Sequence, residues 1–231
     1  MVTINLIADP LIECDHENVY YPSQDSFLLI DYFKKNIDEN YFDGIELSEI
    51  ENVLDLGTGT GIIAIFLQLI KSQNQKFDPR IFASDILEDA ITCAKENEML
   101  NNLNNQIIFL QSDLFKSFPD KLKSSFNIII FNPPYLPSSE YIKNSKNKQL
   151  IDYSWDGGLK GFELLIQFLK EAKEFLNLGK EHYIYCLSSS RTITEDLIKK
   201  IIKLGYNNEI LEKKHYFFEN IFLHRLKCLK S

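Results

Sequence analysis

The tetrapeptide Asn132-Pro133-Pro134-Tyr135 follows a strongly apolar run, and its residue types suit the recognition of a planar amino group. Proline cannot extend a strand ladder, so the Pro133 carbonyl is free to point into a site. The Asn132 side chain offers a second oxygen, and two acceptors can hold both hydrogens of an –NH2 group. The Tyr135 ring can stack on the planar group that carries the nitrogen. We therefore expect these four residues to be catalytic; the alternative is a plain Pro-Pro turn.

The chemistry that this arrangement favours is methyl transfer to an amide or an aromatic amine. Such a nitrogen is a poor nucleophile because its lone pair is delocalised, on the scale of the ~18–20 kcal/mol barrier to peptide rotation. Two acceptors that pull the hydrogens out of plane help to localise the lone pair. Holding the nitrogen in line with a methyl group can supply roughly 7–11 kcal/mol more. No ionised general base is needed.

A glycine-rich loop, Asp55-Leu56-Gly57-Thr58-Gly59-Thr60-Gly61, joins a buried strand to a helix. Glycines allow a tight turn and a close approach of backbone to ligand. The Asp55 carboxylate would repel a phosphate, and the loop has no Walker-type Gly-Lys-Ser/Thr. A ligand that carries an ammonium and a sulfonium group fits better, with Gly57, Thr58, Gly59 and Gly61 in contact with it. A purely structural turn is the alternative.

Two more acidic residues follow the next two strands. Asp85 can accept both hydroxyls of a ribose, although the same carboxylate could cap the helix that follows it. Asp113, followed by Leu114, can accept from the amino group of an adenine while a neighbouring backbone N–H donates to a ring nitrogen. Neither feature alone decides between a ligand contact and a structural role. Their occurrence at consecutive strand ends predicts a nucleoside-bearing ligand.

The elements that must position these residues alternate between strand and helix. This alternation predicts an α/β fold with a seven-stranded, mostly parallel sheet covered on both faces, and a C-terminal antiparallel hairpin. The absence of repeats and linkers predicts one domain over 1–231, with an N-terminal cap and helix in 1–50 and a catalytic core in 51–231. The expected strands are Asn52–Leu56, Arg80–Ser84, Gln106–Leu110, Phe126–Phe131, Tyr183–Leu187, Asn208–Lys213 and Asn220–Lys227. The expected helices are Gln24–Ile37, Ile62–Lys71, Leu87–Leu100, Phe162–Leu178 and Thr192–Leu204.

Composition narrows the class of protein. The 231 residues carry a net charge of −8 and 45% hydrophobic residues. The overall negative charge therefore disfavours electrostatic binding of nucleic acid by the protein as a whole. The longest apolar run, Ile62–Ile70, is too short for a membrane span. The first residues lack a basic start followed by an apolar core, so we expect no secretory signal. The four cysteines and four histidines form no metal-binding pattern, so we expect reduced thiols, no metal and a cytoplasmic location.

In this order, the glycine-rich loop, Asp85, Asp113 and Asn132–Tyr135 resemble a class I S-adenosylmethionine-dependent methyltransferase with a Rossmann-like domain that acts on a planar amine. A narrower resemblance comes from Val19–Leu29, which is similar to the Tyr-x-Pro-x-x-Asp-Thr/Ser-Phe-Leu-Leu segment of the archaeal and eukaryotic branch of HemK-type glutamine methyltransferases. Trp155–Gly161 is similar to the Gly-Gly-x-x-Gly segment of that family. Leu159 and Lys160 stand where the family often has an arginine, which leaves this segment's contacts with substrate open.

The resemblance implies methylation of the glutamine amide in the Gly-Gly-Gln motif of class 1 translation release factors. It implies that S-adenosylmethionine contacts seven positions of this chain and that Asn132–Tyr135 hold the target amide. It also implies a small zinc-binding activator protein, paired with the apolar edge strand Gln106–Leu110; a local loop or helix could cover this edge instead. The seven positions are Ser26, Asp55, Gly57, Asp85, Asp113, Leu114 and Asn132.

Two alternatives remain open from the sequence. An N6-adenine methyltransferase acting on RNA or DNA would use the same tetrapeptide on a flipped base, with Lys143, Lys146 and Lys148 near its phosphates. A solvated loop is the simpler explanation of those lysines and the one we favour, and we expect 138–150 to be mobile. A cofactor-binding scaffold without activity is the other alternative, and the intact Asn132–Tyr135 motif speaks against it.

Overall fold

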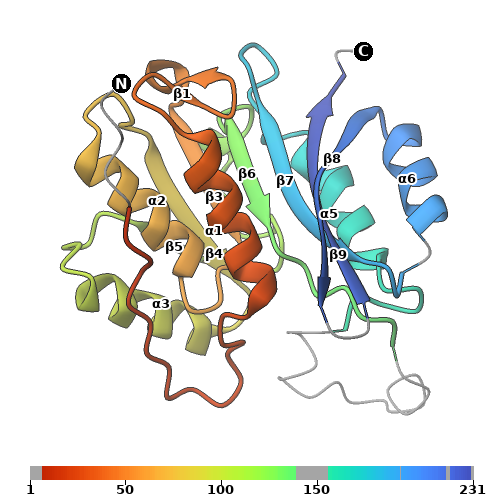
Figure 1. Ribbon diagram of the computed structural model, residues 1–231, viewed down its shortest axis with the longest axis horizontal. Helices are drawn as coiled ribbons and strands as arrows, with labels where there is room; N and C mark the ends of the chain where they lie inside the picture. Colours follow the sequence, from red (N-terminus) through yellow and green to blue (C-terminus); the bar gives the residue numbers. More distant parts are fainter. Residues whose placement is uncertain (1–6, 139–155, 193, 217–218, 230–231) are drawn as a thin grey trace.

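The protein is built around a seven-stranded sheet in the order β5-β4-β3-β6-β7-β9-β8 (Figure 1). The computed structural model describes residues 7–138, 156–192, 194–216 and 219–229. The strands from β5 to β7 are parallel, and β9 pairs antiparallel with both β7 and β8. This confirms the predicted fold class and its C-terminal hairpin. In sheet order the strands are Ile108–Gln111, Arg80–Asp85, Asn52–Leu56, Ile128–Phe131, Tyr183–Ser189, Glu219–Cys228 and Tyr206–Tyr216.

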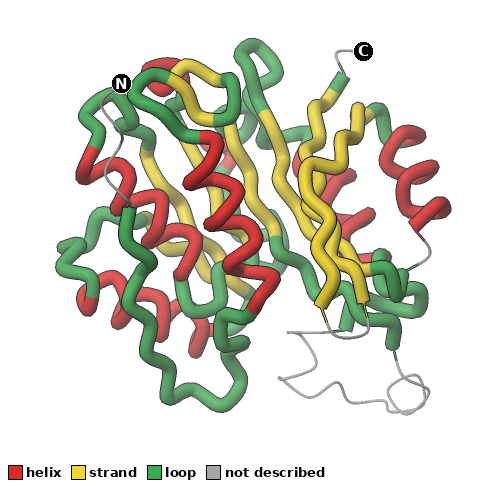
Figure 2. Tube along the Cα trace, in the orientation of Figure 1, coloured by secondary structure: helices red, strands yellow, loops and turns green. Residues whose placement is uncertain are grey.

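Helices cover the two faces of the sheet in separate groups (Figure 2). α1 (Gln24–Asn36), α2 (Ile62–Gln73) and α3 (Glu88–Leu100) pack in sequence beside one another on one side. α5 (Glu163–Ala172) and α6 (Thr194–Lys203) pack together on the other side. The short elements β1 (Tyr41–Phe42), β2 (Ile45–Glu46), η1 (Leu47–Glu49) and η2 (Asp120–Leu122) lie outside this sheet.

The central strands are apolar on both sides because each side meets a helical layer. Val53 and Ile130 pack into the core under α1 and α2, whereas Leu54 and Ile129 pack into the core under α5. All four side chains are fully buried. Since complete burial of such a side chain stabilises the fold by about 1.5–3 kcal/mol, these strands form a rigid base for the loops at their ends.

Several predicted boundaries were wrong, and three of the errors have a cause that the contacts identify. β5 begins at Ile108 rather than Gln106 because the carboxylate of Glu98 accepts the backbone N–H groups of Gln106 and Ile107, at 2.6 and 2.8 Å. The long helix ends at Ala172 instead of Leu178. Beyond it, Leu176 forms a bridge with Phe126, which also removes Phe126 from the start of β6.

No helix in the described part of the chain is both long and apolar enough to cross a bilayer. The predicted loop around Lys143, Lys146 and Lys148, and its expected mobility, fall within 139–155, which lies outside the described residues.

Candidate active site

A cavity of about 980 Å³ opens at the carboxyl ends of β3, β4, β5 and β6. The chain runs outward from β3 to β4 and β5 in one direction, and from β6 to β7 in the other. Ligands bind in open α/β sheets at such a reversal of strand order. Register places Leu56 beside Phe131, so the glycine-rich loop and the Asn132 tetrapeptide leave neighbouring strands at the same level.

The glycine-rich loop turns tightly under the cavity. Gly57 and Gly59 have φ values of +69° and +54°, a region that side chains disfavour. A Cβ on Gly57 would also lie 3.1 Å from the Phe131 ring. Both glycines line the cavity, so the loop brings bare backbone against a bound ligand.

Asp55 stabilises the conformation of the glycine-rich loop through hydrogen bonds. Its Oδ2 accepts from the Thr58 hydroxyl at 2.6 Å and from the Ala64 backbone N–H at 3.2 Å. Burial raises the pKa of Asp55 to about 7, although both hydrogen bonds favour the ionised form. The carboxyl is therefore both a structural anchor and a group whose charge responds to a nearby cation.

Gly61 differs from the other predicted contact residues because it does not line the cavity. Its φ is +83°, and a Cβ there would lie 2.9 Å from the Cβ of Ala94. Its role in the structure is to let the start of α2 approach α3, and a direct contact between Gly61 and the cofactor has no support.

Asp85 links the glycine-rich loop to the segment that leads into α3. Its carboxylate accepts the N–H of Gly59 at 3.0 Å and that of Leu87 at 3.0 Å, whereas α3 itself has no side-chain N-cap, so the predicted capping role is wrong. An ionised carboxylate has about four acceptor positions, which leaves two for ribose hydroxyls. Burial raises its pKa.

Asp113 and Leu114 lie at the same end of the cavity. Asp113 accepts from the Lys116 ammonium at 2.5 Å in an exposed ion pair. Leu114 is buried and has a φ of +47°, which is strained for a side chain of this size. No described residue accepts its backbone N–H. The pair thus offers a carboxylate and a free donor side by side, as the recognition of an adenine edge requires.

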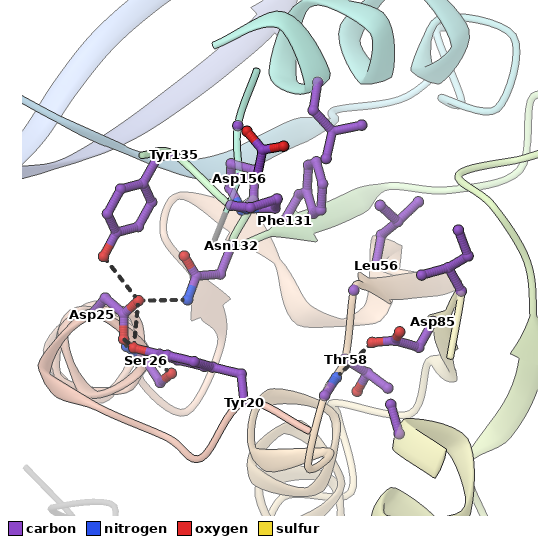
Figure 3. Close-up of a pocket in the computed structure, with 18 of the residues that line it drawn as sticks. Tyr20, Asp25, Ser26, Leu56, Thr58, Asp85, Phe131, Asn132, Tyr135 and Asp156 are labelled. Atoms are coloured by element: carbon purple, nitrogen blue, oxygen red, sulfur yellow. Dashed lines mark hydrogen bonds between the residues drawn. The ribbon is translucent and has the colours of Figure 1, made fainter. Parts of the chain in front are cut away.

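At the other end of the cavity the buried carboxylate of Asp25 gathers hydrogen-bond donors (Figure 3). Its Oδ2 accepts from Asn132 Nδ2 at 3.1 Å and from the Tyr135 hydroxyl at 3.2 Å. The Tyr20 hydroxyl lies 3.2 Å from Oδ1, and the backbone N–H of Ser26 donates to Oδ1 at 2.7 Å. Burial and the Asp25 charge raise the pKa of Tyr20 to about 12 and that of Tyr135 further, so both remain donors.

The structure thus adds Asp25 to the site, a residue that our sequence interpretation did not single out. The Tyr20-x-Pro22-x-x-Asp25 pattern carries the signal, because it brings a hydroxyl and a carboxylate of one short segment together. The predicted neighbour Ser26 is buried and lines the cavity.

Two acceptors at this end have no donor among the described residues. The Asn132 Oδ1 atom is buried without a hydrogen bond. The Pro133 carbonyl likewise receives no backbone or side-chain donor from the described chain. A buried acceptor left without a donor is costly, so the pair fits an external –NH2 group.

The Gly-Gly-x-x-Gly segment supports the tetrapeptide from behind. A Cβ on Gly157 would lie 2.6 Å from the Pro134 carbonyl oxygen, and one on Gly161 would lie 2.6 Å from that of Tyr135. The Gly157 N–H donates to the Leu136 carbonyl at 2.9 Å. These contacts let two backbones pack directly against each other.

The polar groups that line the cavity fit S-adenosylmethionine. Asp85 and the Leu114 N–H suit an adenosine, and Asp55 lies between them and Asn132 as a partner for positive charge. Figure 3 shows Asp85 and Asn132 at opposite sides of the pocket, which suits a donor at one end and an acceptor at the other. No cluster of three or more His, Cys, Asp or Glu residues that could hold a metal occurs in the described ranges.

Comparisons with known proteins agree with this geometry. The family model of the methyltransferase small domain matches residues 28–154. A Methanocaldococcus jannaschii protein assigned as a protein N5-glutamine methyltransferase is 35% identical over 90% of this chain and 91% of its own length. The eRF1 methyltransferase catalytic subunit mtq2 of Schizosaccharomyces pombe is 27% identical, with 87% and 85% covered.

Among solved structures, a chain of the E. cuniculi Mtq2-Trm112 complex, which is responsible for methylation of the eRF1 termination factor, has the same fold. Its TM-score is 0.60 at 20% identity, over 92% of this chain and 99% of that one. The extent of the match to the small-domain family and to the archaeal relative identifies the chain as a member of the S-adenosylmethionine-dependent protein N5-glutamine methyltransferase family.

Proposed function

We propose that this enzyme methylates the side-chain nitrogen of the glutamine in the Gly-Gly-Gln motif of a class 1 translation release factor, in the cytoplasm. The observation that supports this acceptor is a pair of oxygens, Asn132 Oδ1 and the Pro133 carbonyl, that receive no hydrogen bond from the described residues and lie across the cavity from Asp85 (Figure 3). A primary amide has two N–H hydrogens in one plane and matches two such acceptors. The family relatives with the same activity in their names add to this argument.

The chain's own residues act by holding and orienting the acceptor. When bound, S-adenosylmethionine would supply an electrophilic methyl group on a sulfonium, and the carbon–sulfur bond would break as the carbon–nitrogen bond forms. Asn132 Oδ1 and the Pro133 carbonyl each accept one hydrogen of the amide, which turns the nitrogen lone pair toward the methyl group. The Tyr135 ring closes one side of the acceptor space. The nitrogen then loses one proton, which remains hydrogen-bonded to the acceptor oxygen until water takes it.

We further propose that a small zinc-binding activator pairs with the β5 edge. Within the described sheet the outer strands are β5 and β8. β8 carries Glu209, Glu212, Lys213 and Lys214 and a register irregularity, features that discourage strand pairing. β5 has no charge, and Ile108 is 40% exposed. An activator that adds a strand here would bury this apolar edge and leave the cavity open.

The test is methyl transfer from labelled S-adenosylmethionine, with and without the activator. The acceptors are a class 1 release factor, the same factor with its Gly-Gly-Gln glutamine replaced, and adenine-containing RNA and DNA. We expect label only on the intact factor. Label on nucleic acid but not on the factor would establish the adenine methyltransferase instead.

A further inference from the structure

We infer that Asp25 is the positioning residue that fixes the amide of Asn132 so that its oxygen, and not its nitrogen, faces the acceptor. An asparagine amide can rotate by half a turn and exchange donor for acceptor at nearly equal volume. The methyl transfer proposed above requires the Asn132 side-chain oxygen to face the acceptor in the cavity, and this inference rests on that reaction. Another group in the chain must therefore favour one of the two orientations of the Asn132 amide over the other.

The chemistry of the contact sets the orientation. An ionised carboxylate only accepts hydrogen bonds, so the atom of Asn132 that faces Asp25 at 3.1 Å must be the –NH2 group. The reversed amide would place two oxygens against each other in a buried site and lose this bond. The oxygen that results points away from Asp25 (Figure 3) and has no described donor.

The position of the Asp25 carboxylate is itself fixed from three directions. The Ser26 N–H holds it to the first turn of α1, the Tyr20 hydroxyl belongs to the segment before that helix, and the Tyr135 hydroxyl belongs to the catalytic tetrapeptide. The Asp25 carboxylate, which is only 4% exposed, is therefore met by five donor groups of the chain, the fifth being the Ser26 hydroxyl at 3.4 Å. A carboxylate held this way cannot turn to release Asn132.

This arrangement also explains selectivity for the acceptor. Because Asn132 Nδ2 is engaged, the Asn132 side chain presents only an acceptor to the cavity, and the Pro133 carbonyl presents another. A group that offers two N–H hydrogens is matched, whereas a carboxylate or a carbonyl would meet like dipoles. The device therefore distinguishes glutamine from glutamate at the target position.

A double-mutant cycle in single-turnover methyl transfer tests the inference. Asp25→Asn should lower the rate about tenfold or more and leave cofactor affinity within about threefold, because a misoriented Asn132 loses a transition-state contact. In an Asn132→Ala background the same change should have an effect below about threefold. A full effect in that background would contradict the inference. Asp31→Asn is the matched control, since it removes an exposed carboxylate from the same helix.

A second readout does not depend on which acceptor is correct. In protein labelled with ¹⁵N-asparagine, the side-chain –NH2 signal of Asn132, assigned by its loss in Asn132→Ala, should move and exchange faster with solvent in Asp25→Asn. It should stay in place in Asp31→Asn. An unmoved signal in Asp25→Asn would overturn the inference even if the release factor proved to be the substrate.

The variants must be folded for these comparisons. Cofactor binding and the melting temperature establish this for Asp25→Asn. Should that variant fail to fold, Tyr20→Phe combined with Tyr135→Phe keeps the carboxylate and removes two of its donors. The Asn132 signal should then move as well, and an unchanged signal would contradict the inference. Absence of label on every acceptor, with the Asn132 signal moved as expected, would count against the proposed function and not against the role of Asp25.

Discussion

At the residue scale, the two amide atoms of Asn132 lie in different surroundings. The nitrogen donates to the buried Asp25, and the oxygen has no described donor. This asymmetry is what a binding site for an external N–H group requires, and it separates Asn132 from the structural asparagines of the chain, such as Asn97, whose oxygen and nitrogen both have partners.

Removal of the Asn132 side chain should therefore affect chemistry and spare the cofactor. We expect Asn132→Ala to lower kcat about 100-fold, comparable to the loss of one preorganised polar contact in other active sites, with cofactor affinity within about threefold. Rates with saturating acceptor and binding calorimetry measure the two effects. Asn104→Ala, at an exposed turn position, is the control. Unchanged kcat in Asn132→Ala would contradict the site assignment.

Asp55 predicts a pH dependence of cofactor binding. Its pKa is about 7 in the unliganded protein, and a positively charged ligand favours the ionised form. Affinity should therefore rise as pH increases from about 6 to 8, by up to about tenfold, with release of a proton. Calorimetry in buffers of different ionisation enthalpy measures both quantities. Asp55→Asn should remove this part of the pH dependence; an identical slope in both proteins would show that Asp55 is not the group involved.

At the element scale, the site depends on backbone segments that pack without side chains between them. The 157–161 segment lies against the carbonyls of Pro134 and Tyr135, so its glycines allow the close backbone approach that supports the tetrapeptide. The family resemblance singled out this segment, but only the structure shows that it supports Asn132–Tyr135 from behind.

Gly157→Ala should consequently impair catalysis. The new Cβ would lie 2.5 Å from the Gly161 carbonyl and 2.6 Å from that of Pro134, so one backbone must move. A displacement near 1 Å at a reacting group can cost about 100-fold, and we expect kcat to fall about 10- to 100-fold. Gly179→Ala is the control, because its nearest neighbour is the Asn177 side chain at 3.3 Å. Equal kcat for the two variants would contradict the supporting role.

The two edge strands give a matched test of the activator site. Ile108 on β5 and Ile210 on β8 are 40% and 42% exposed. Ile108→Asp places a charge on the proposed interface and should weaken binding of the activator about tenfold or more, or about 1.4 kcal/mol. Ile210→Asp should leave it unchanged. Co-purification and calorimetry with the activator decide between the edges, and the opposite ranking would move the interface to β8.

The sequence predicted the elements better than their ends. Both predicted boundaries of the buried strand Asn52–Leu56 were correct, because the apolar run marks its start and the glycine-rich loop marks its end. The start of β5 depends on the carboxylate of Glu98, and the end of α5 depends on the bridge between Leu176 and Phe126. Both contacts involve residues outside the element, so the periodicity of the element does not encode them. The β1–β2 hairpin was missed although Asp43-Gly44, both with positive φ, is a typical two-residue turn.

The residues of the candidate site likewise divide into those that could be predicted from the sequence and those that could not. Strand-end residues such as Asp85 could be predicted because parallel strands bring their carboxyl ends together. Gly61 and Asp25 could not be assigned from the motif alone. Whether a glycine faces a ligand or a neighbouring helix, and which donors surround a carboxylate, depends on packing between segments that are distant in the chain.

At the scale of the whole molecule, the sheet buries a histidine whose charge state links folding to pH. His224 on β9 is fully buried between Ser188 and Asn208, and burial lowers its pKa from 6.5 to about 4. Below about pH 6.5 the unfolded chain therefore gains a proton that the folded chain does not. The free energy of unfolding from this residue should fall between about pH 6.5 and 4, by up to about 3 kcal/mol.

Asp55 acts in the opposite direction over much of this range, because its raised pKa favours the folded state at lower pH. Substitution of His224 separates its contribution to the free energy of unfolding from that of Asp55. Urea unfolding at pH 7 and pH 4.5 should show a smaller loss of stability for His224→Gln than for the unsubstituted protein, while the exposed His215→Gln should match the latter. The same loss in all three proteins would exclude His224 as the source.

The central claim, that Asn132 and Pro133 present a glutamine amide for methylation, is tested most directly by locating the product. Purified enzyme, activator and S-adenosylmethionine would be incubated with a class 1 release factor, and the factor would be digested and sequenced by mass spectrometry. The account predicts a single added methyl group on the side-chain nitrogen of the Gly-Gly-Gln glutamine, formed about 100-fold more slowly by Asn132→Ala. A methyl group at any other residue, or the same product from Asn132→Ala at an undiminished rate, would contradict it.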